Sequence, residues 1–187
     1  ISFKTIENTD HNYVIINTAE ERQQLLTQLL AQKAVSFDTE TTGTDANEAE
    51  LVGMSFSWKT GEGFYIPIPE DQTEAQSIVN EFRSFFENET IEKIGQNIKY
   101  DIIMLKWYGI DVQGVLFDTM LAHYLIDADT RHNMDFLAES YLNYSPISIT
   151  ELIGKKGKGQ DNMRNVDIDK AGEYAAEDAD ITLQLKH

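Results

Sequence analysis

Apolar residues along the chain follow two spacings, one typical of strands and one typical of helices. Short β-rich apolar runs predict strands at 13–16, 34–40, 51–58, 64–68, 91–95 and 115–117. Apolar residues at helical spacing predict helices from 18 to about 33, 73–86, 97–107, 119–126, 134–142 and from about 169 to the end. Capping boxes beginning at Thr18 and Thr73 are expected to start the first two helices.

The order of these elements predicts the fold class. The runs 34–40, 51–58 and 64–68 are separated by short connections, including the turn at 61–63, and are expected to form an antiparallel meander. The later alternation of strand and helix favours parallel pairing. We therefore expect an α/β protein with a five-stranded mixed sheet, three antiparallel strands then parallel ones, flanked by helices. This order resembles the ribonuclease-H-like fold.

Composition narrows the class of protein. The chain has 187 residues, 41% of them hydrophobic, which is enough to bury one core, so residues 1–187 are expected to form one domain. Because it has no cysteine, disulfides and thiolate metal sites are excluded, and a reducing, cytoplasmic setting is expected. No apolar run is long enough to span a membrane. The chain begins at Ile1 and stops inside a predicted helix, which suggests an excised piece of a longer polypeptide.

Charge points away from a nucleic-acid-binding surface but towards cation binding. With 15 basic and 32 acidic residues the formal charge is −17, whereas nonspecific binding to nucleic acid or anionic membrane needs a basic face. Clustered carboxylates are suited to hold hard divalent cations. The loop 154–160, which holds Lys155, Lys156 and Lys158, is a local cluster of positive charge and a candidate for contact with phosphate.

Two acidic residues end the second predicted strand. Asp38 and Glu40 are two residues apart, so the period of a strand places both side chains on one face. A solvated strand end would explain this pair equally well if it were alone. The same stretch begins like an EF-hand loop, but Ala49 stands where the calcium loop needs a bidentate Glu, so EF-hand binding is rejected.

Two further polar pairs lie on predicted helices at a spacing of four. Asn97 and Asp101 share a face at the start of one helix, although Asn97 could also act only as its N-cap. Tyr174 and Asp178 share a face of the last helix, although a solvated amphipathic helix would give the same pattern. Asp180 is expected to point elsewhere.

Together these pairs form Asp-x-Glu, Asn-x-x-x-Asp and Tyr-x-x-x-Asp in chain order. The chain resembles the 3′-5′ exonuclease domain of the bacterial DNA polymerase I family, of the type that has a tyrosine in its third motif. The resemblance covers nearly the whole chain and includes the runs 95–101, 117–120, 131–135 and 174–185.

The resemblance implies roles for these residues. Asp38, Glu40, Asp101 and Asp178 would hold two divalent cations, Mg²⁺ or Mn²⁺, for two-metal hydrolysis of a phosphodiester. Asp38 would bridge both ions, Glu40 and Asp178 would complete one site, and Asp101 would serve the other. Tyr174 would aim the attacking water together with Glu40, because a phenol with a pKa near 10 is a poor proton acceptor. A related class uses histidine in this motif, and none of the chain's four histidines stands there.

The resemblance also implies the substrate and partners. Thr39, Gln96, Asn97 and Arg131 match positions near the terminal nucleotides, although Arg131 could equally form a surface ion pair. The expected substrate is a single-stranded or frayed DNA 3′ end, delivered by a C-terminal polymerase domain of the same chain. A monomer in the cytoplasm, associated with the nucleoid and free of membrane, is expected.

Two other functions remain open from the residues. A ribonuclease D-like RNA 3′ exonuclease would share the carboxylates, and comparison of DNA with RNA substrates distinguishes the two. A catalytically silent structural domain of a polymerase is the second alternative, which the presence of all four acids disfavours.

Overall fold

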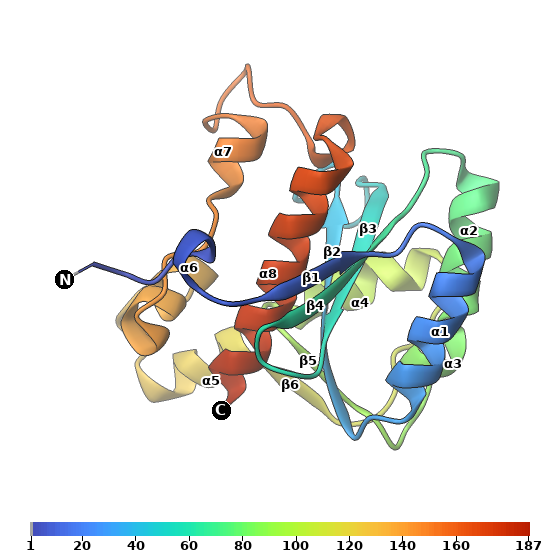
Figure 1. The fold of residues 1–187 in the computed structure, drawn as a ribbon, viewed down its shortest axis with the longest axis horizontal. Helices are drawn as coiled ribbons and strands as arrows, with labels where there is room; N and C mark the ends of the chain where they lie inside the picture. Colours follow the sequence, from blue (N-terminus) through green and yellow to red (C-terminus); the bar gives the residue numbers. More distant parts are fainter. Residues whose placement is uncertain (1) are drawn as a thin grey trace.

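A computed structural model describes residues 2–187, which form a mixed sheet covered by helices on both faces (Figure 1). The sheet has six strands in the order β1-β4-β3-β2-β5-β6. Their bounds are β1 Asn12–Ile15, β2 Ala34–Thr41, β3 Leu51–Ser57, β4 Glu62–Pro67, β5 Glu92–Gly95 and β6 Leu116–Asp118. The helices are α1 Ala19–Leu30, α2 Gln72–Glu81, α3 Arg83–Phe86, α4 Ile98–Trp107, α5 Thr119–Ile126, α6 Met134–Leu137, α7 Ile149–Ile153 and α8 Ile168–Lys186.

The pairing confirms the predicted order of antiparallel and parallel strands, but the count of five strands was wrong. β2, β3 and β4 pair antiparallel, and β2, β5 and β6 pair parallel. The sixth strand is β1, predicted as a strand but not assigned to the sheet, which pairs parallel with the outer edge of β4. It joins there because β4 ends the antiparallel meander and would otherwise leave its backbone groups unpaired.

Helix starts follow local side chains, and one prediction here was wrong. The capping box at Thr18 is present, with its hydroxyl accepting from the backbone N–H of Glu21. The second box is not formed, because Asp71 caps α2 by accepting from the N–H of Glu74 and thereby starts the helix before Thr73. The predicted helix over 73–86 divides at Phe82 into α2 and α3.

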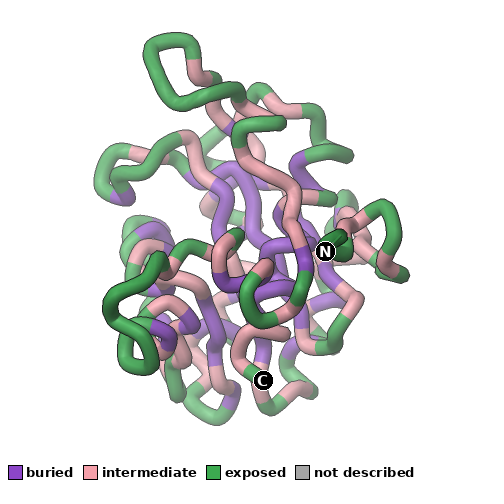
Figure 2. Tube along the Cα trace, turned by 90° about the vertical axis from the view of Figure 1, so that its left-hand side faces the viewer, coloured by how far each residue is buried: buried purple, intermediate pink, exposed green. Residues whose placement is uncertain are grey.

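One face of the sheet carries the main hydrophobic core. Helices α1 to α4 pack there, and the contacts include the edge-to-face pair of Phe37 on β2 with Phe86 on α3, whose ring centroids are 5.2 Å apart. Figure 2 shows the buried segments in the centre of the molecule and the exposed loops around them. In residues 2–187 no helix is both long and apolar enough to cross a membrane.

The other face is covered by α8, which lies close to the strands (Figure 1). Small residues make this approach possible: Ala175, Ala176 and Ala179 of α8 are fully buried. A Cβ atom added to Gly63 of β4 would lie 2.6 Å from the carbonyl oxygen of Ala176, so a larger residue does not fit there. The close packing brings the middle of α8 down onto β2.

Candidate active site

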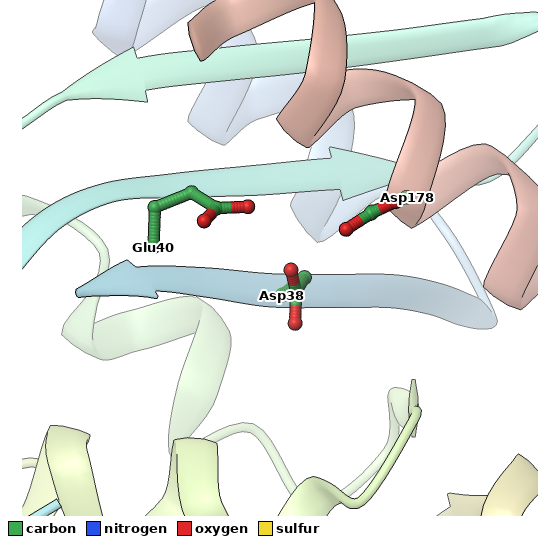
Figure 3. Close-up of side chains that lie close together, drawn as sticks. All are labelled: Asp38, Glu40 and Asp178. Carbon is green, nitrogen blue, oxygen red and sulfur yellow. The ribbon is translucent and has the colours of Figure 1, made fainter. Parts of the chain in front are cut away.

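Three carboxylates meet where α8 crosses β2. Asp38 and Glu40 lie on β2 and Asp178 lies on α8, and oxygen atoms of the three are all within 4.8 Å of one another. Figure 3 shows these side chains turned toward a common point between the strand and the helix. The alternation of side chains along β2 explains the arrangement. Phe37 points into the main core, so Asp38 and Glu40 point to the α8 face.

The cluster is largely shielded from solvent. Glu40 is 6% exposed and Asp178 is 7% exposed, while Asp38 is partly exposed. Burial raises the pKa of Asp38 to about 7, although hydrogen bonds from the Thr39 backbone and the Glu40 side chain lower it. Burial, and then the charges of Asp38 and Asp178, raise the pKa of Glu40 well above its ordinary value. The pKa of Asp178 is raised by burial and by the charges of Asp38 and Glu177. Three ionised carboxylates in this environment repel one another unless a bound positive charge offsets them.

Asp101, on α4, contacts the same strand through Thr39. Its Oδ1 atom accepts hydrogen bonds from the backbone N–H of Thr39, at 3.0 Å, and from the Thr39 hydroxyl, at 2.5 Å. Asp101 is 2% exposed, and burial followed by the charge of Asp38 raises its pKa well above the ordinary value. It is therefore a neighbour of the cluster, although it is not one of the three carboxylates that converge within 4.8 Å.

Tyr174 lies one helical turn before Asp178 and is partly buried. Burial, and then the negative charges of Asp178, Glu40 and Asp38, raise the pKa of its phenol far above the usual range. The hydroxyl therefore keeps its proton throughout the neutral range, and it can donate a hydrogen bond but cannot serve as a base.

The predicted substrate contacts lie in different settings. The Gln96 amide is held on both sides, because its Nε2 donates to the carbonyl of His132 at 2.8 Å and its Oε1 accepts from Thr119. Arg131 is exposed, and its guanidinium lies 5.0 Å from the centroid of the Phe136 ring. Arg131 is in none of the ion pairs found within residues 2–187.

Asn97 occupies the N-cap position of α4, but its side chain makes no capping hydrogen bond. Its backbone is left-handed, with φ 56° and ψ 46°. The capping role that the sequence left open for Asn97 belongs instead to Asp118, whose carboxylate accepts from the N–H groups of both Asn97 and Ile98. No role was predicted for Asp118. An Asp directly before the α5 run is the local signal of an N-cap that could have drawn attention to it.

The donor set fits a hard divalent cation. Oε1 of Glu40 is buried and has no hydrogen-bond partner among the described residues, so one oxygen of the cluster is left for another ligand. All three converging donors are carboxylate oxygens, which suit Mg²⁺ and Mn²⁺. The group contains no histidine.

Comparison with solved structures supports the fold. The chain superimposes on Trypanosoma brucei RNase D with a TM-score of 0.76 at 17% identity, covering 94% of this chain and 64% of that one. It superimposes on Brucella melitensis NrnC with bound Mg²⁺ with a TM-score of 0.67 at 21% identity, covering 95% and 79%. Likeness at these identities shows the fold alone, and it confirms the predicted ribonuclease-H-like architecture.

Sequence comparison shows the family. Residues 13–187 match the 3′-5′ exonuclease family of A-type DNA polymerases. DNA polymerase I of Borreliella burgdorferi is 39% identical over 184 residues, which is 97% of this chain and 20% of that protein. DNA polymerase I of Pseudomonas aeruginosa is 40% identical over 169 residues, 86% of this chain and 18% of that protein. The chain thus spans about a fifth of the length of these curated relatives. This chain belongs to the 3′-5′ exonuclease family of DNA polymerase I.

Proposed function

We propose that this chain hydrolyses the terminal phosphodiester of single-stranded or frayed DNA 3′ ends and acts as the proofreading domain, residues 1–187, of a DNA polymerase I. The observation that carries the proposal is the convergence of Asp38, Glu40 and Asp178 within 4.8 Å, with one oxygen of Glu40 left unpaired. The family match supplies the reaction, because a cluster of acids alone does not distinguish a nuclease from another metal site.

The proposed cofactor is a pair of divalent cations, Mg²⁺ or Mn²⁺. Asp38, Glu40 and Asp178 would hold one ion, and Asp38 with Asp101 would hold the other. When bound, such a pair offsets the charge of the phosphodiester, makes water nucleophilic near neutral pH and stabilises the leaving oxygen. The raised carboxylate pKa values support this assignment, because bound cations would relieve the repulsion among these side chains.

The protein's own groups position the reactants. Tyr174 keeps its proton, so we assign it to donate a hydrogen bond that orients the attacking water, while Glu40 accepts one from it. Thr39 holds Asp101 through two hydrogen bonds and thereby fixes that carboxylate against β2. Preorganised groups of this kind lower the barrier by holding the reacting atoms in line.

Substrate contacts are proposed on β2, just after β5 and on the loop between α5 and α6. Thr39, Gln96, Asn97 and Arg131 would contact the terminal nucleotides or their phosphates. The exposed loop with Lys155, Lys156 and Lys158 would contact phosphates farther along the strand. With a formal charge of −17 the chain would bind long DNA weakly, so we propose that a polymerase domain of the same polypeptide delivers the 3′ end and that the chain is a monomer.

A gel assay with a 5′-labelled single strand tests this function. We expect a ladder of products shortened from the 3′ end in Mg²⁺ and none in excess EDTA, because the carboxylates need the cation. A 3′-phosphorothioate end and a circular strand serve as controls that must resist degradation. Shortening of matched RNA at a higher rate than DNA would replace the proposal by a ribonuclease D-like activity, and no Mg²⁺-dependent cleavage of either would favour a silent structural domain.

Replacement of Tyr174 by phenylalanine is expected to reduce kcat by about 10- to 100-fold and to leave measurable activity. The ring still packs in its partly buried site, but the hydrogen bond to the attacking water is lost. Single-turnover cleavage of an oligonucleotide measures the loss, and an unchanged Mg²⁺ dependence is expected because Tyr174 is not a proposed ligand. Complete loss of activity in a folded variant would show that the phenol does more than orient water.

A further inference from the structure

One carboxylate fastens the starts of two neighbouring helices. Oδ1 of Asp118 accepts from the backbone N–H of Asn97 at 2.9 Å, and Oδ2 accepts from that of Ile98 at 3.1 Å. The same Oδ1 accepts from the N–H of Met120 at 2.9 Å, at the start of α5. Helix starts carry unpaired N–H groups and partial positive charge, so a carboxylate is well suited to this position.

The segment that Asp118 holds leads directly to the active site. β5 and β6 pair in register up to Gly95 and Asp118, so the Asp118 side chain meets the chain just beyond β5. Thr119 strengthens this junction, because its hydroxyl also donates to the carbonyl of Gly95 at 3.2 Å and to the Gln96 side chain. Asp101 follows in the first turn of α4, three residues after the amide of Ile98.

Asp118 also holds the backbone of Asn97, a proposed substrate contact. Left-handed backbone is rare for residues other than glycine and costs free energy unless the surroundings secure it. The N–H groups on the two sides of Asn97, its own and that of Ile98, both donate to Asp118. The Asn97 side chain makes no hydrogen bond among the described residues. The side chain lines an open groove of about 530 Å³ between α4 and α5 and is available to a ligand.

We infer that Asp118 is a positioning residue for the nuclease reaction: it secures the left-handed start of α4 and so directs Asp101 to the metal site and Asn97 to the substrate. Asp118 acts through the backbone of α4, on the residue proposed to help hold the second cation and on the residue proposed to contact the terminal nucleotide. The inference rests on the proposed function for the roles of both Asn97 and Asp101.

The test compares Asp118→Ala with Asp71→Ala, a matched control. Asp71 caps α2 through the N–H of Glu74 at 2.9 Å, is exposed, and has no part in the site. Both variants should lower Tm by a few degrees, because each loses an N-cap. Only Asp118→Ala should weaken Mn²⁺ binding, by about 10- to 100-fold, and raise KM for a short single strand. Electron paramagnetic resonance at a temperature well below Tm measures the Mn²⁺ binding. Asp118→Asn, which keeps one acceptor oxygen, should recover part of the loss.

A double variant tests the route through the backbone. Glycine adopts left-handed φ freely, so Asn97→Gly added to Asp118→Ala should restore Mn²⁺ binding to within about 3-fold of wild type while KM stays high. The inference is overturned if Asp118→Ala and Asp71→Ala bind Mn²⁺ alike, or if the added glycine restores nothing. If the wild-type chain binds Mn²⁺ but does not cleave DNA, the proposed function fails while the Mn²⁺ comparison still decides the role of Asp118. If it binds no Mn²⁺, both fail.

Discussion

Replacement of Asp178 by alanine is expected to lower kcat for single-stranded DNA by at least about 1,000-fold. Asp178 is the contribution of α8 to the carboxylate cluster, and the two β2 acids cannot replace it from one strand face. Loss of one ligand from a metal pair removes both charge compensation and the alignment of the attacking group. Asp38→Ala should be equally severe, because Asp38 would help to hold both ions.

The matched control for Asp178 lies two residues farther along the same helix. Asp180 is also buried, but its carboxylate accepts from the Tyr13 hydroxyl at 2.7 Å and from the N–H of Gly61 at 3.0 Å, away from the cluster. Asp180→Asn should therefore lower stability and leave kcat within about 3-fold of wild type, because it is a structural rather than a catalytic carboxylate. Single-turnover assays at a temperature where both variants are folded make the comparison. Near-wild-type activity in Asp178→Ala would contradict the proposed site.

The second large effect concerns stability, pH and metal. The metal-free protein is expected to lose stability as pH rises from 5.5 to 8. The pKa of Asp38 is raised in the folded state to about 7, so the folded state keeps a proton that the unfolded chain has already lost. A group with a raised folded pKa contributes stability that is fully present below its unfolded pKa and is lost as pH rises through the folded value. The loss is about 2 kcal/mol from this one group, or a Tm lower by roughly 4–8 °C.

Divalent cations should reverse this trend. Mg²⁺ at the proposed site would bind the ionised carboxylates of the folded state, so it should raise Tm more at pH 8 than at pH 5.5. Scanning calorimetry of metal-free and Mg²⁺-loaded protein across this range measures both effects. In Asp38→Asn the pH-dependent loss should shrink, and the metal-free protein should be more stable than wild type at pH 8 because one repelling charge is absent. A metal-free Tm that rises between pH 5.5 and 8 would contradict the raised carboxylate pKa values.

The local sequence pattern was sufficient to predict features that depend on a single strand or helix. The period of two on β2 placed Asp38 and Glu40 on one face, and the spacing of four on α8 placed Tyr174 and Asp178 one turn apart. The strands and helices could also be predicted locally, because the spacing of apolar residues in each segment depends only on which face of that segment is buried. The resemblance then joined these pairs into one family pattern before any distance was known.

Tertiary structure alone decided what depends on contacts between distant segments. The sixth strand joined the sheet because β4 had a free edge, which is a property of the assembled meander and not of residues 12–15. Small residues on α8 and Gly63 determined how close Asp178 comes to β2. Asp101 is bound to Thr39, next to Asp38 on β2, and is not one of the three carboxylates that converge within 4.8 Å.

The start of α4 shows most clearly what the sequence determined and what the tertiary structure decided. Sequence alone made Asn97 a candidate cap for its own helix, because Asn is a common residue there. In the fold the cap comes from Asp118, 21 residues farther along, because parallel pairing of β5 with β6 brings that carboxylate to the start of α4. By itself the sequence determined the elements, their exposed and buried faces and the chemistry available. The tertiary structure decided which acidic side chains converge and which carboxylate secures the start of α4, because both depend on pairing between segments far apart in the sequence.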